Sequence, residues 1–198
     1  MFVIFDTEYT ADKGMLEDGF NGWKNREIVQ IAALKVDENL DVIEELNIYA
    51  KPKINPVMGK YFTDLFGFSN EFLQEKGVSF TEAYNKFREF AGGFACYSHG
   101  WSSRPNNIAD GEVMLENART NNIYTDKDID YRNIAGWFKK EYERRGIKIE
   151  RQCSGEIATL LGCADKLEHL GLKAHNALYD VYSILAGLRF LEFSNQAD

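Results

Sequence analysis

The chain has 198 residues, of which 44% are hydrophobic and 27% are charged, and these values are ordinary for a globular protein. The length predicts a single domain, residues 1–198, with enough chain to bury a substantial core. The net charge of −8 argues against a protein that coats nucleic acid through a broad basic surface, although it permits an enzyme that acts on one nucleic-acid end.

The N-terminus predicts a buried strand that leads into carboxylates. Four apolar residues, Phe2 to Phe5, run directly into Asp6-Thr7-Glu8, and such a run is typical of a strand buried on both faces. Since side chains alternate along a strand, Asp6 and Glu8 share one face and Thr7 takes the other. Two buried carboxylates repel each other, so we expect a divalent cation to compensate them. The alternative is that the strand ends at Phe5 and both acids are solvated in a loop.

Two further strands are predicted in the N-terminal third. The polar stretch 11–26 is too long for a tight hairpin and predicts a flap near the acids, in which Trp23 either covers the site or anchors the loop. The segments 27–36 and 42–50 have a strong apolar bias, and residues 37–39 between them form a turn, which predicts a hairpin.

The rest of the chain alternates between predicted helices and short strands. Residues 60–77 are irregular and short-helical, with Ser69 as a cap and Gly77 as a stop. This order is that of an α/β domain with one sheet covered by helices on both faces. The predicted helices cover 70–76, 79 or 81 to about 91, 110–119, 133–145, 155–161 and 176–193, and the predicted strands cover 94–98 and 129–131.

The last predicted helix carries an acid beside its apolar stripe. Asp180 lies near the stripe that contains Val181, Ile184 and Leu188, and an acid there is costly unless it is paired or binds a metal. His175 precedes Asp180 by five residues, where a loop enters the helix, so it can approach the same cleft from another direction. A lone histidine is more often a structural or surface residue than a base.

The three features occur together: Asp-x-Glu in an N-terminal strand, a mid-chain Asp that opens a helix, and His-x4-Asp in the last helix. In this combination the chain resembles the DEDDh family of 3′→5′ exonucleases, which includes ribonuclease T, oligoribonuclease and the proofreading exonuclease of DNA polymerase III. The resemblance covers about residues 1–190, including EIVQIAA at 27–33, Asp130-Tyr131 before a helix, and LFGF at 65–68, which is similar to the family's Leu-Thr-Gly-Ile. It implies a ribonuclease H-like fold, with a five-stranded mixed sheet in the order 3-2-1-4-5.

The resemblance also implies roles for five residues. Asp6, Glu8, Asp110 and Asp180 are then the metal ligands, and His175 is the general base. Carboxylates suit Mg²⁺ or Mn²⁺, and two ions about 3.5–4 Å apart can bind the attacking and leaving oxygens of a phosphodiester. The expected cofactor is therefore two Mg²⁺ ions, for which Mn²⁺ can substitute, and the expected product is a nucleoside 5′-monophosphate.

The middle motif departs from the family pattern. The family commonly has an Asn or Gly shortly before a Phe-Asp or Trp-Asp pair, whereas the stretch 97–110 is longer here and lacks the aromatic residue. We choose Asp110 because it opens a helix after the fourth strand and is followed by an apolar run. Asp126, Asp128 and Asp130 come later in the chain and would need a different topology.

Apolar and aromatic side chains near these motifs are the predicted substrate contacts. Leu65 and Phe66 match the family position that wedges against the terminal bases, and Phe62, Tyr9 and Trp23 are placed to stack on them. The alternative is that Phe62, Leu65 and Phe66 belong to the core. Candidate phosphate contacts, if they are more than solvated surface cations, are Lys13, Lys60 and Arg104.

The sequence thus predicts a metal-dependent 3′→5′ exonuclease that acts on the 3′ ends of single-stranded RNA or DNA. One alternative is a catalytically silent ribonuclease H-like interaction module, against which the complete acidic set argues. Another is a proofreading subunit of a polymerase, which shares the chemistry but has a different partner. RNA or DNA preference stays open, as does the oligomeric state, although the family often forms homodimers.

The expected compartment is the cytoplasm. The sequence has no run of 18 apolar residues, so we expect no membrane association, and its N-terminus lacks the pattern of a signal peptide. Cys96, Cys153 and Cys163 show no metal-ligand spacing and are expected to be reduced structural thiols.

Overall fold

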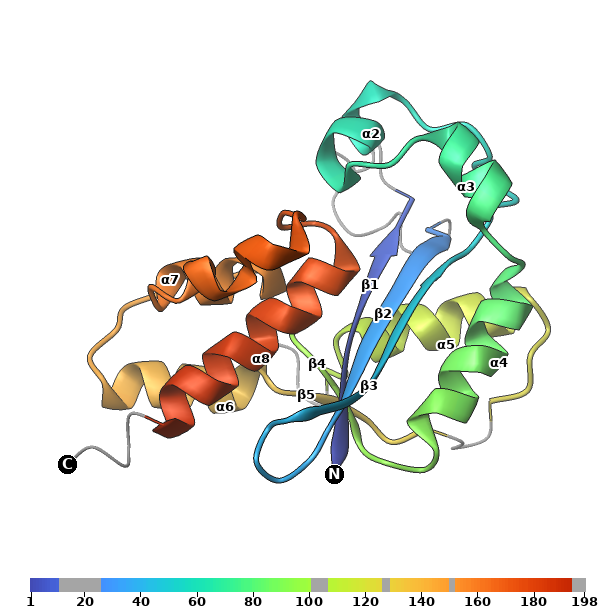
Figure 1. Ribbon diagram of the computed structural model, residues 1–198. Helices are drawn as coiled ribbons and strands as arrows, with labels where there is room; N and C mark the ends of the chain where they lie inside the picture. The colour runs from blue at the N-terminus through green and yellow to red at the C-terminus, as the bar shows by residue number, and fades with distance from the viewer. Residues whose placement is uncertain (11–25, 101–106, 126–128, 150–151, 194–198) are drawn as a thin grey trace.

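The computed structural model of the protein describes residues 1–10, 26–100, 107–125, 129–149 and 152–193 (Figure 1). Several predicted features lie outside these ranges: most of the flap, with Lys13 and Trp23, and also Arg104, Asp126 and Asp128. Among the described residues no helix is long and apolar enough to cross a membrane.

Five strands form one mixed sheet in the order β3-β2-β1-β4-β5, which confirms the predicted order. Antiparallel pairing joins β3 to β2 and β2 to β1, whereas parallel pairing joins β4 to β1 and β5 to β4. The strands are β1 (Phe2–Tyr9), β2 (Ile28–Val36), β3 (Val42–Tyr49), β4 (Cys96–Ser98) and β5 (Tyr131–Asn133).

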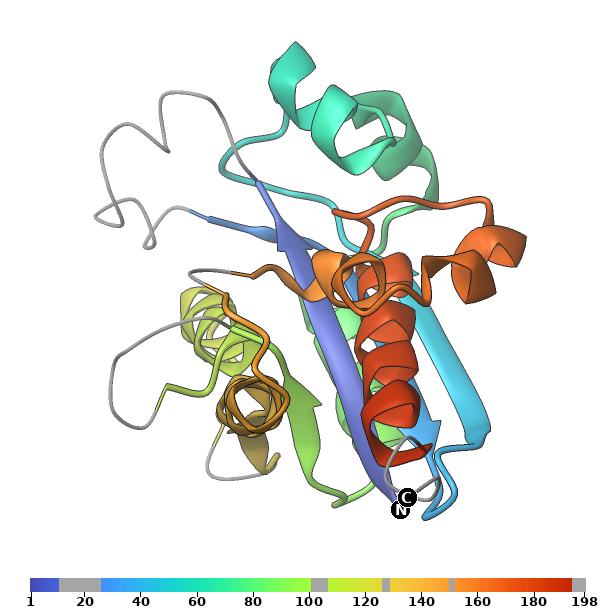
Figure 2. The ribbon, with the colours of Figure 1, turned by 90° about the vertical axis from the view of Figure 1, so that its left-hand side faces the viewer.

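Helices cover both faces of the sheet, as Figures 1 and 2 show: α8, α6 and α7 lie on one side, and α4 and α5 on the other. A separate pair, α2 and α3, stands beyond the carboxyl end of β1. The helices are α2 (Lys60–Phe66), α3 (Asn70–Lys76), α4 (Phe80–Ala91), α5 (Asp110–Thr120), α6 (Ala135–Arg144), α7 (Ile157–Leu160) and α8 (Ala177–Phe193), with 3₁₀ segments η2 (Ser154–Glu156) and η3 (Ala164–Leu170).

The alternation of side chains along β1 divides the core into two layers. Ile4 belongs to the cluster that packs against α8, whereas Val3 and Phe5 belong to the cluster that packs against α4 and α5. The strand continues without a break to Tyr9, so the predicted alternation holds and the alternative of a solvated loop after Phe5 is wrong. The two acids therefore follow Ile4 toward the α8 side.

Most predicted boundaries match the structure to within two residues. Ser69 and Ser79 cap α3 and α4, and their hydroxyl oxygens accept bonds from backbone N–H groups three residues later. The last strand is shifted from 129–131 to Tyr131–Asn133 because its parallel register pairs Tyr131 with Cys96. The 3₁₀ segment η3 was not predicted, since a run of 3₁₀ turns lacks the 3.6-residue period of an α-helix.

The α2–α3 pair has a small aromatic core of its own. Phe62 and Phe66 pack edge to face with ring centroids 4.6 Å apart, and Tyr49 at the end of β3 contacts Phe68 and Phe72 in the same manner. Val29 of β2 belongs to this cluster as well. The pair is thereby fixed to the end of the sheet where β1 terminates.

Candidate active site

Three carboxylates meet where β1 approaches the first turn of α8. Asp6 and Glu8 on β1 and Asp180 on α8 each offer an oxygen, and these oxygens all lie within 4.8 Å of one another. All three side chains are buried, with Asp6 4%, Glu8 8% and Asp180 3% exposed. The structure thus brings together the first and last sequence motifs, as predicted.

Asp110 reaches this cluster from the other side of the sheet. It is the first residue of α5, and its Oδ1 accepts a hydrogen bond of 2.8 Å from the hydroxyl of Thr7, whose side chain points to the α5 face. The hydroxyl oxygen of Ser98, at the end of β4, accepts a bond from the Asp110 backbone N–H. Asp110 is not a member of the close triad, but its charge raises the pKa of Asp6.

Burial dominates the electrostatics of the site. Desolvation raises the pKa of Asp180 to about 7 and that of Asp110 to about 6, and it raises the pKa values of Asp6 and Glu8 well above their usual range. Repulsion among the carboxylates adds to desolvation, since Asp110 and Asp180 both raise the pKa values of Asp6 and Glu8. The four groups therefore resist becoming ionised together unless a cation neutralises them.

The donor set fits a divalent cation. Hard carboxylate oxygens that are buried and mutually repulsive are the ligands that divalent magnesium and manganese prefer. Asp6, Glu8 and Asp180 are close enough to share one cation, whose charge would remove the repulsion that raises their pKa values.

Three donors fix the carboxylate of Asp180. The hydroxyl of Ser154 donates to Oδ2 at 2.9 Å, the backbone N–H of His175 donates to Oδ1 at 3.2 Å, and the backbone N–H of Gly155 also stabilises the ionised form. Gly155 has no room for a side chain, because a Cβ there would lie 2.5 Å from Oδ1 of Asp180 and 2.8 Å from Cβ of Ala174. The sequence analysis gave neither Ser154 nor Gly155 a role in the site.

His175 lies at the turn that precedes α8. Its backbone is left-handed, with φ of 67°, a conformation that is uncommon for residues other than glycine. The side chain is half-buried, and burial, with a smaller contribution from Lys173, lowers its pKa while Glu156 opposes the shift. The imidazole is therefore neutral near pH 7 and able to accept a proton.

Two buried amides hold the start of α8 on β2. The Oδ1 of Asn176 accepts a bond from Leu178 N–H and so caps the helix. Gln30 of β2 accepts a bond from Ala177 N–H at 3.1 Å and donates to Asn176 Oδ1 at 3.2 Å. Gln30 was missed as a site residue, although a glutamine within an apolar strand is itself a signal.

The predicted substrate contacts divide into two groups. Phe62 is fully buried and Phe66 is 4% exposed, and both rings belong to the aromatic core of the α2–α3 pair, as the alternative reading expected. Leu65 and Tyr9 are partly exposed and stay candidates. Lys60 is exposed and pairs with Asp64 at 2.6 Å.

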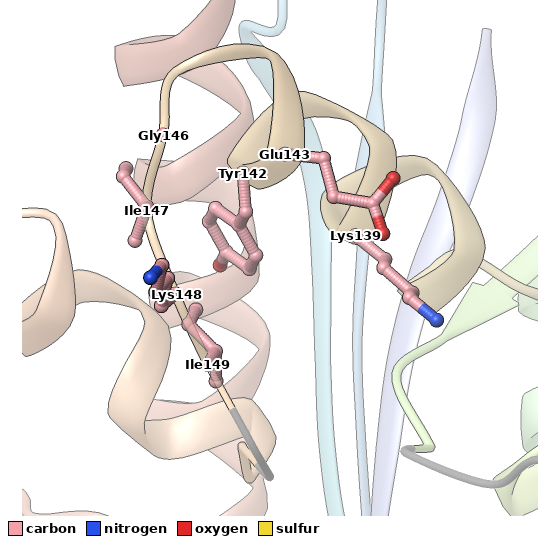
Figure 3. Close-up of a pocket in the computed structure, with 7 residues that line it drawn as sticks. All are labelled: Lys139, Tyr142, Glu143, Gly146, Ile147, Lys148 and Ile149. Atoms are coloured by element: carbon pink, nitrogen blue, oxygen red, sulfur yellow. The ribbon is translucent and has the colours of Figure 1, made fainter.

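One cavity of about 370 Å³ lies away from this cluster (Figure 3). Its walls come from the end of α6 and the segment that follows, and it includes none of the predicted site residues. The carboxylate cluster, rather than this hollow, is thus the candidate site. The cavity is lined by Lys139, Tyr142, Glu143, Gly146, Ile147, Lys148 and Ile149.

Comparison with known proteins supports this choice. The sequence model of the RNase_T family, described as an exonuclease family, matches residues 3–187. The comparison with curated protein sequences gives no match.

Solved structures of nucleases have the same ribonuclease H-like fold. The nuclease domain of 3′hExo, a DEDDh family member bound to rAMP, has a TM-score of 0.68 and 15% identity over 98% of this chain and 92% of that one. Cell-death related nuclease 4 has a TM-score of 0.69 and 22% identity, over 98% of this chain and 64% of that one. The zinc-bound complex of E. coli exonuclease I with single-stranded DNA has a TM-score of 0.70 and 17% identity, over 99% of this chain and 41% of that one. The chain thus spans less than two thirds of the last two.

The crowding around Gly155 makes a first prediction. Gly155→Ala should displace Asp180 and lower the affinity for Mn²⁺ by about 10–100-fold, the usual effect of disturbing a group that supports a metal ligand. Isothermal titration calorimetry measures this affinity, and circular dichroism checks that the fold persists. Gly136→Ala on α6 is the control, because nothing lies within 4 Å of its added Cβ. Equal Mn²⁺ affinity in wild type and Gly155→Ala would contradict the prediction.

The raised pKa values predict how stability depends on pH without metal. In the unfolded chain carboxyls ionise near pH 4, whereas the pKa is about 6 for Asp110 and about 7 for Asp180 in the folded protein. The folded state therefore binds more protons over this interval, and the free energy of unfolding should fall as pH rises from about 4 to about 7. Melting temperatures measured in EDTA across this range test the trend.

Two variants make the trend specific to the site. Asp6→Asn should flatten the fall in melting temperature, because it removes one repelling charge from the cluster. Glu38→Gln, in the exposed turn after β2, should keep the slope of the wild type. A slope that Asp6→Asn leaves unchanged would show that the buried carboxylates do not cause it.

Proposed function

The chain belongs to the RNase_T exonuclease family, and from this premise we propose that it removes nucleotides one at a time from the 3′ end of single-stranded RNA or DNA. The observation that carries the proposal is the buried triad of Asp6, Glu8 and Asp180, with His175 at the turn that enters the helix of Asp180. The match over residues 3–187 supports a single exonuclease domain.

The metal role follows from the donor set. Asp6, Glu8 and Asp180 would hold the divalent cations, and Asp110, which accepts a bond from the Thr7 hydroxyl, would complete the acidic set. Bound Mg²⁺ would supply charge stabilisation at the phosphate and lower the pKa of water. The catalytically silent alternative requires a site that has lost cation binding, and the intact triad argues against it.

His175 acts as the general base in this proposal. Its neutral imidazole takes a proton from the attacking water as the water oxygen bonds to phosphorus. The bond between phosphorus and the 3′ oxygen of the penultimate nucleotide breaks, that oxygen takes up a proton from solvent to become a 3′ hydroxyl, and a nucleoside 5′-monophosphate leaves. The lowered pKa of His175 keeps the imidazole unprotonated at neutral pH.

The polarity and the strand preference rest on the relatives. The nuclease domain of 3′hExo binds rAMP, and exonuclease I of E. coli binds single-stranded DNA. The first observation supports an active site that accepts a single nucleotide, and the second supports one that accepts an unpaired strand. The choice between RNA and DNA is then made by comparing oligonucleotides of matched sequence with Mg²⁺ and with Mn²⁺.

The direction of degradation is a direct test. A block on the 3′ end of a labelled single-stranded oligonucleotide should stop the release of mononucleotides, whereas a block on the 5′ end should leave it intact. Chromatography of the products gives the measurement. Cleavage of a circular single strand, or equal protection by both blocks, would refute an exonuclease with this polarity.

His175 gives a second test. His175→Asn removes the imidazole but keeps a residue that tolerates a left-handed backbone, so the single-turnover rate should fall by about 10²–10⁴-fold. The affinity for Mn²⁺ should change little, because all four carboxylates remain. In the wild type, protonation of the imidazole should lower the rate at acid pH, below pH 6.5 because the pKa of His175 is lowered. This acid limb of the pH–rate profile should disappear in the variant.

His169→Asn is the matched control for that variant. His169 is exposed on η3, and its ring meets Tyr182 edge to face with centroids 6.3 Å apart. This substitution should leave both the rate and the acid limb unchanged. Loss of Mn²⁺ affinity rather than rate in His175→Asn would assign the histidine to metal binding instead of proton transfer.

A further inference from the structure

The segment between β3 and α2 exposes apolar side chains beside the candidate site. Val57 is 81% exposed, the highest value among the large hydrophobic residues that the structure describes, and Ile54 is 54% exposed. Lys53 and Lys60 are also exposed on either side of them. Exposed apolar side chains grouped on one short segment indicate a binding surface rather than a packing role.

The backbone of this segment is held in place by side chains from elsewhere. The carboxylate of Glu27 accepts bonds from the backbone N–H groups of Lys53, Ile54 and Asn55 at 2.5, 2.7 and 2.8 Å. The side-chain amide of Asn70 pairs in both directions with the backbone of Met58, at 3.0 and 2.8 Å. Ile54 and Val57 are thus presented from an ordered backbone, and little conformational entropy is lost when a ligand binds.

The same contacts link the segment to the end of β1, the strand that carries Asp6 and Glu8. Glu27 forms two hydrogen bonds with Thr10, which lies two residues beyond Glu8. The Thr10 N–H donates to the Glu27 carbonyl at 2.8 Å, and the Glu27 N–H donates to the Thr10 hydroxyl at 3.0 Å. On its other side, Lys53 Nζ donates at 3.4 Å to Oδ1 of Asn121, which caps the end of α5 opposite Asp110. Figure 2 shows the segment passing from β3 to α2 near the end of β1.

Charge favours a nucleic-acid ligand over a protein. Residues 51–60 contain three lysines and no acid, in a chain whose net charge is −8. Of the acids outside the segment, Asp64 pairs with Lys60, and the Glu27 carboxylate is taken up by backbone N–H groups of residues 53–55. Lysine is depleted at protein–protein interfaces, whereas lysines beside surfaces that contact bases are typical of single-strand binding. The two apolar side chains and the cations therefore match one strand with alternating bases and phosphates.

We propose that residues 53–57 form a platform that binds the nucleotide strand upstream of its 3′ end, which rests on the function proposed above. Ile54 and Val57 pack against bases, and Lys53 contacts phosphate. The platform lies beyond Thr10 rather than within the carboxylate cluster, so only a strand of several nucleotides reaches it. It thereby makes the enzyme favour longer substrates without changing the chemical step.

The test compares a dinucleotide with a strand of about 12 nucleotides, within the usual range of single-strand binding sites. The double variant Ile54→Ser/Val57→Ser should raise KM for the longer strand about fivefold or more, since one base contact contributes about 1–3 kcal/mol. It should leave kcat and all values for the dinucleotide unchanged. Ile43→Ser on β3 is the control, because Ile43 lies outside the platform and its side chain is as exposed as that of Ile54, at 53% against 54%. This variant should keep the wild-type KM for both substrates.

Binding measured without turnover separates this inference from the proposed function. In EDTA, fluorescence anisotropy should show weaker binding of the longer strand to the double variant than to wild type. Lys53→Gln should also lower the dependence of log affinity on log salt by about one. Platform-dependent binding without any degradation would sink the proposed function and keep the platform. An equal affinity in wild type and double variant, or an equal loss on both substrate lengths, would overturn the platform.

Discussion

The structure depends on keeping like charges together in a buried site. Desolvation of an ionised carboxylate costs several kcal/mol, and a hydrogen bond to a charged group returns about 1.5–3 kcal/mol. Asp180 receives bonds from Ser154, Gly155 and His175, and yet burial still raises its pKa to about 7. The donors therefore orient the carboxylate but do not offset its burial and repulsion, so the site itself favours a cation.

The surrounding elements are braced so that this repulsion does not separate them. Helix α8 is tied to β2 through Gln30, and α5 is tied to the start of the same strand through the buried Asn117. Asn117 accepts a bond from Ile28 N–H and donates to the Arg26 carbonyl, both at 3.0 Å. Each helix that carries a site aspartate is thus anchored to β2 through buried amide side chains. Because an unpaired buried amide is costly, these bonds fix both helices relative to β1.

The sequence predicted those parts of the fold that follow from periodicity. Alternation along β1 placed Asp6 and Glu8 on one face and Thr7 on the other, since a strand permits no other arrangement. The spacing in the last helix placed Asp180 near the core in the same way. The close approach of these acids could be predicted only through the family resemblance, because periodicity does not determine which strand end meets which helix.

Other site features could not be read from the sequence because they depend on contacts distant in the chain. Ser154 and Gly155 meet Asp180 across 26 and 25 positions, and a Ser-Gly pair before a short helix looks like any cap. Phe62 and Phe66 fit either a base wedge or a core, since an aromatic ring suits both. Only the packing around Phe68 and Leu73 decides for the core.

The core that contains Phe62 and Phe66 is separate from the core that packs against α8. The aromatic cluster of α2 and α3 shares Val29 with the sheet but no residue with the cluster that packs against α8. The α2 helix meets the loop of His175 through Lys173, whose ammonium donates to the Asp64 carbonyl at 2.9 Å. Since Lys173 is exposed, this single bond is weak beside the packing within either cluster. The α2–α3 pair can therefore repack while the carboxylates keep their positions on β1 and α8.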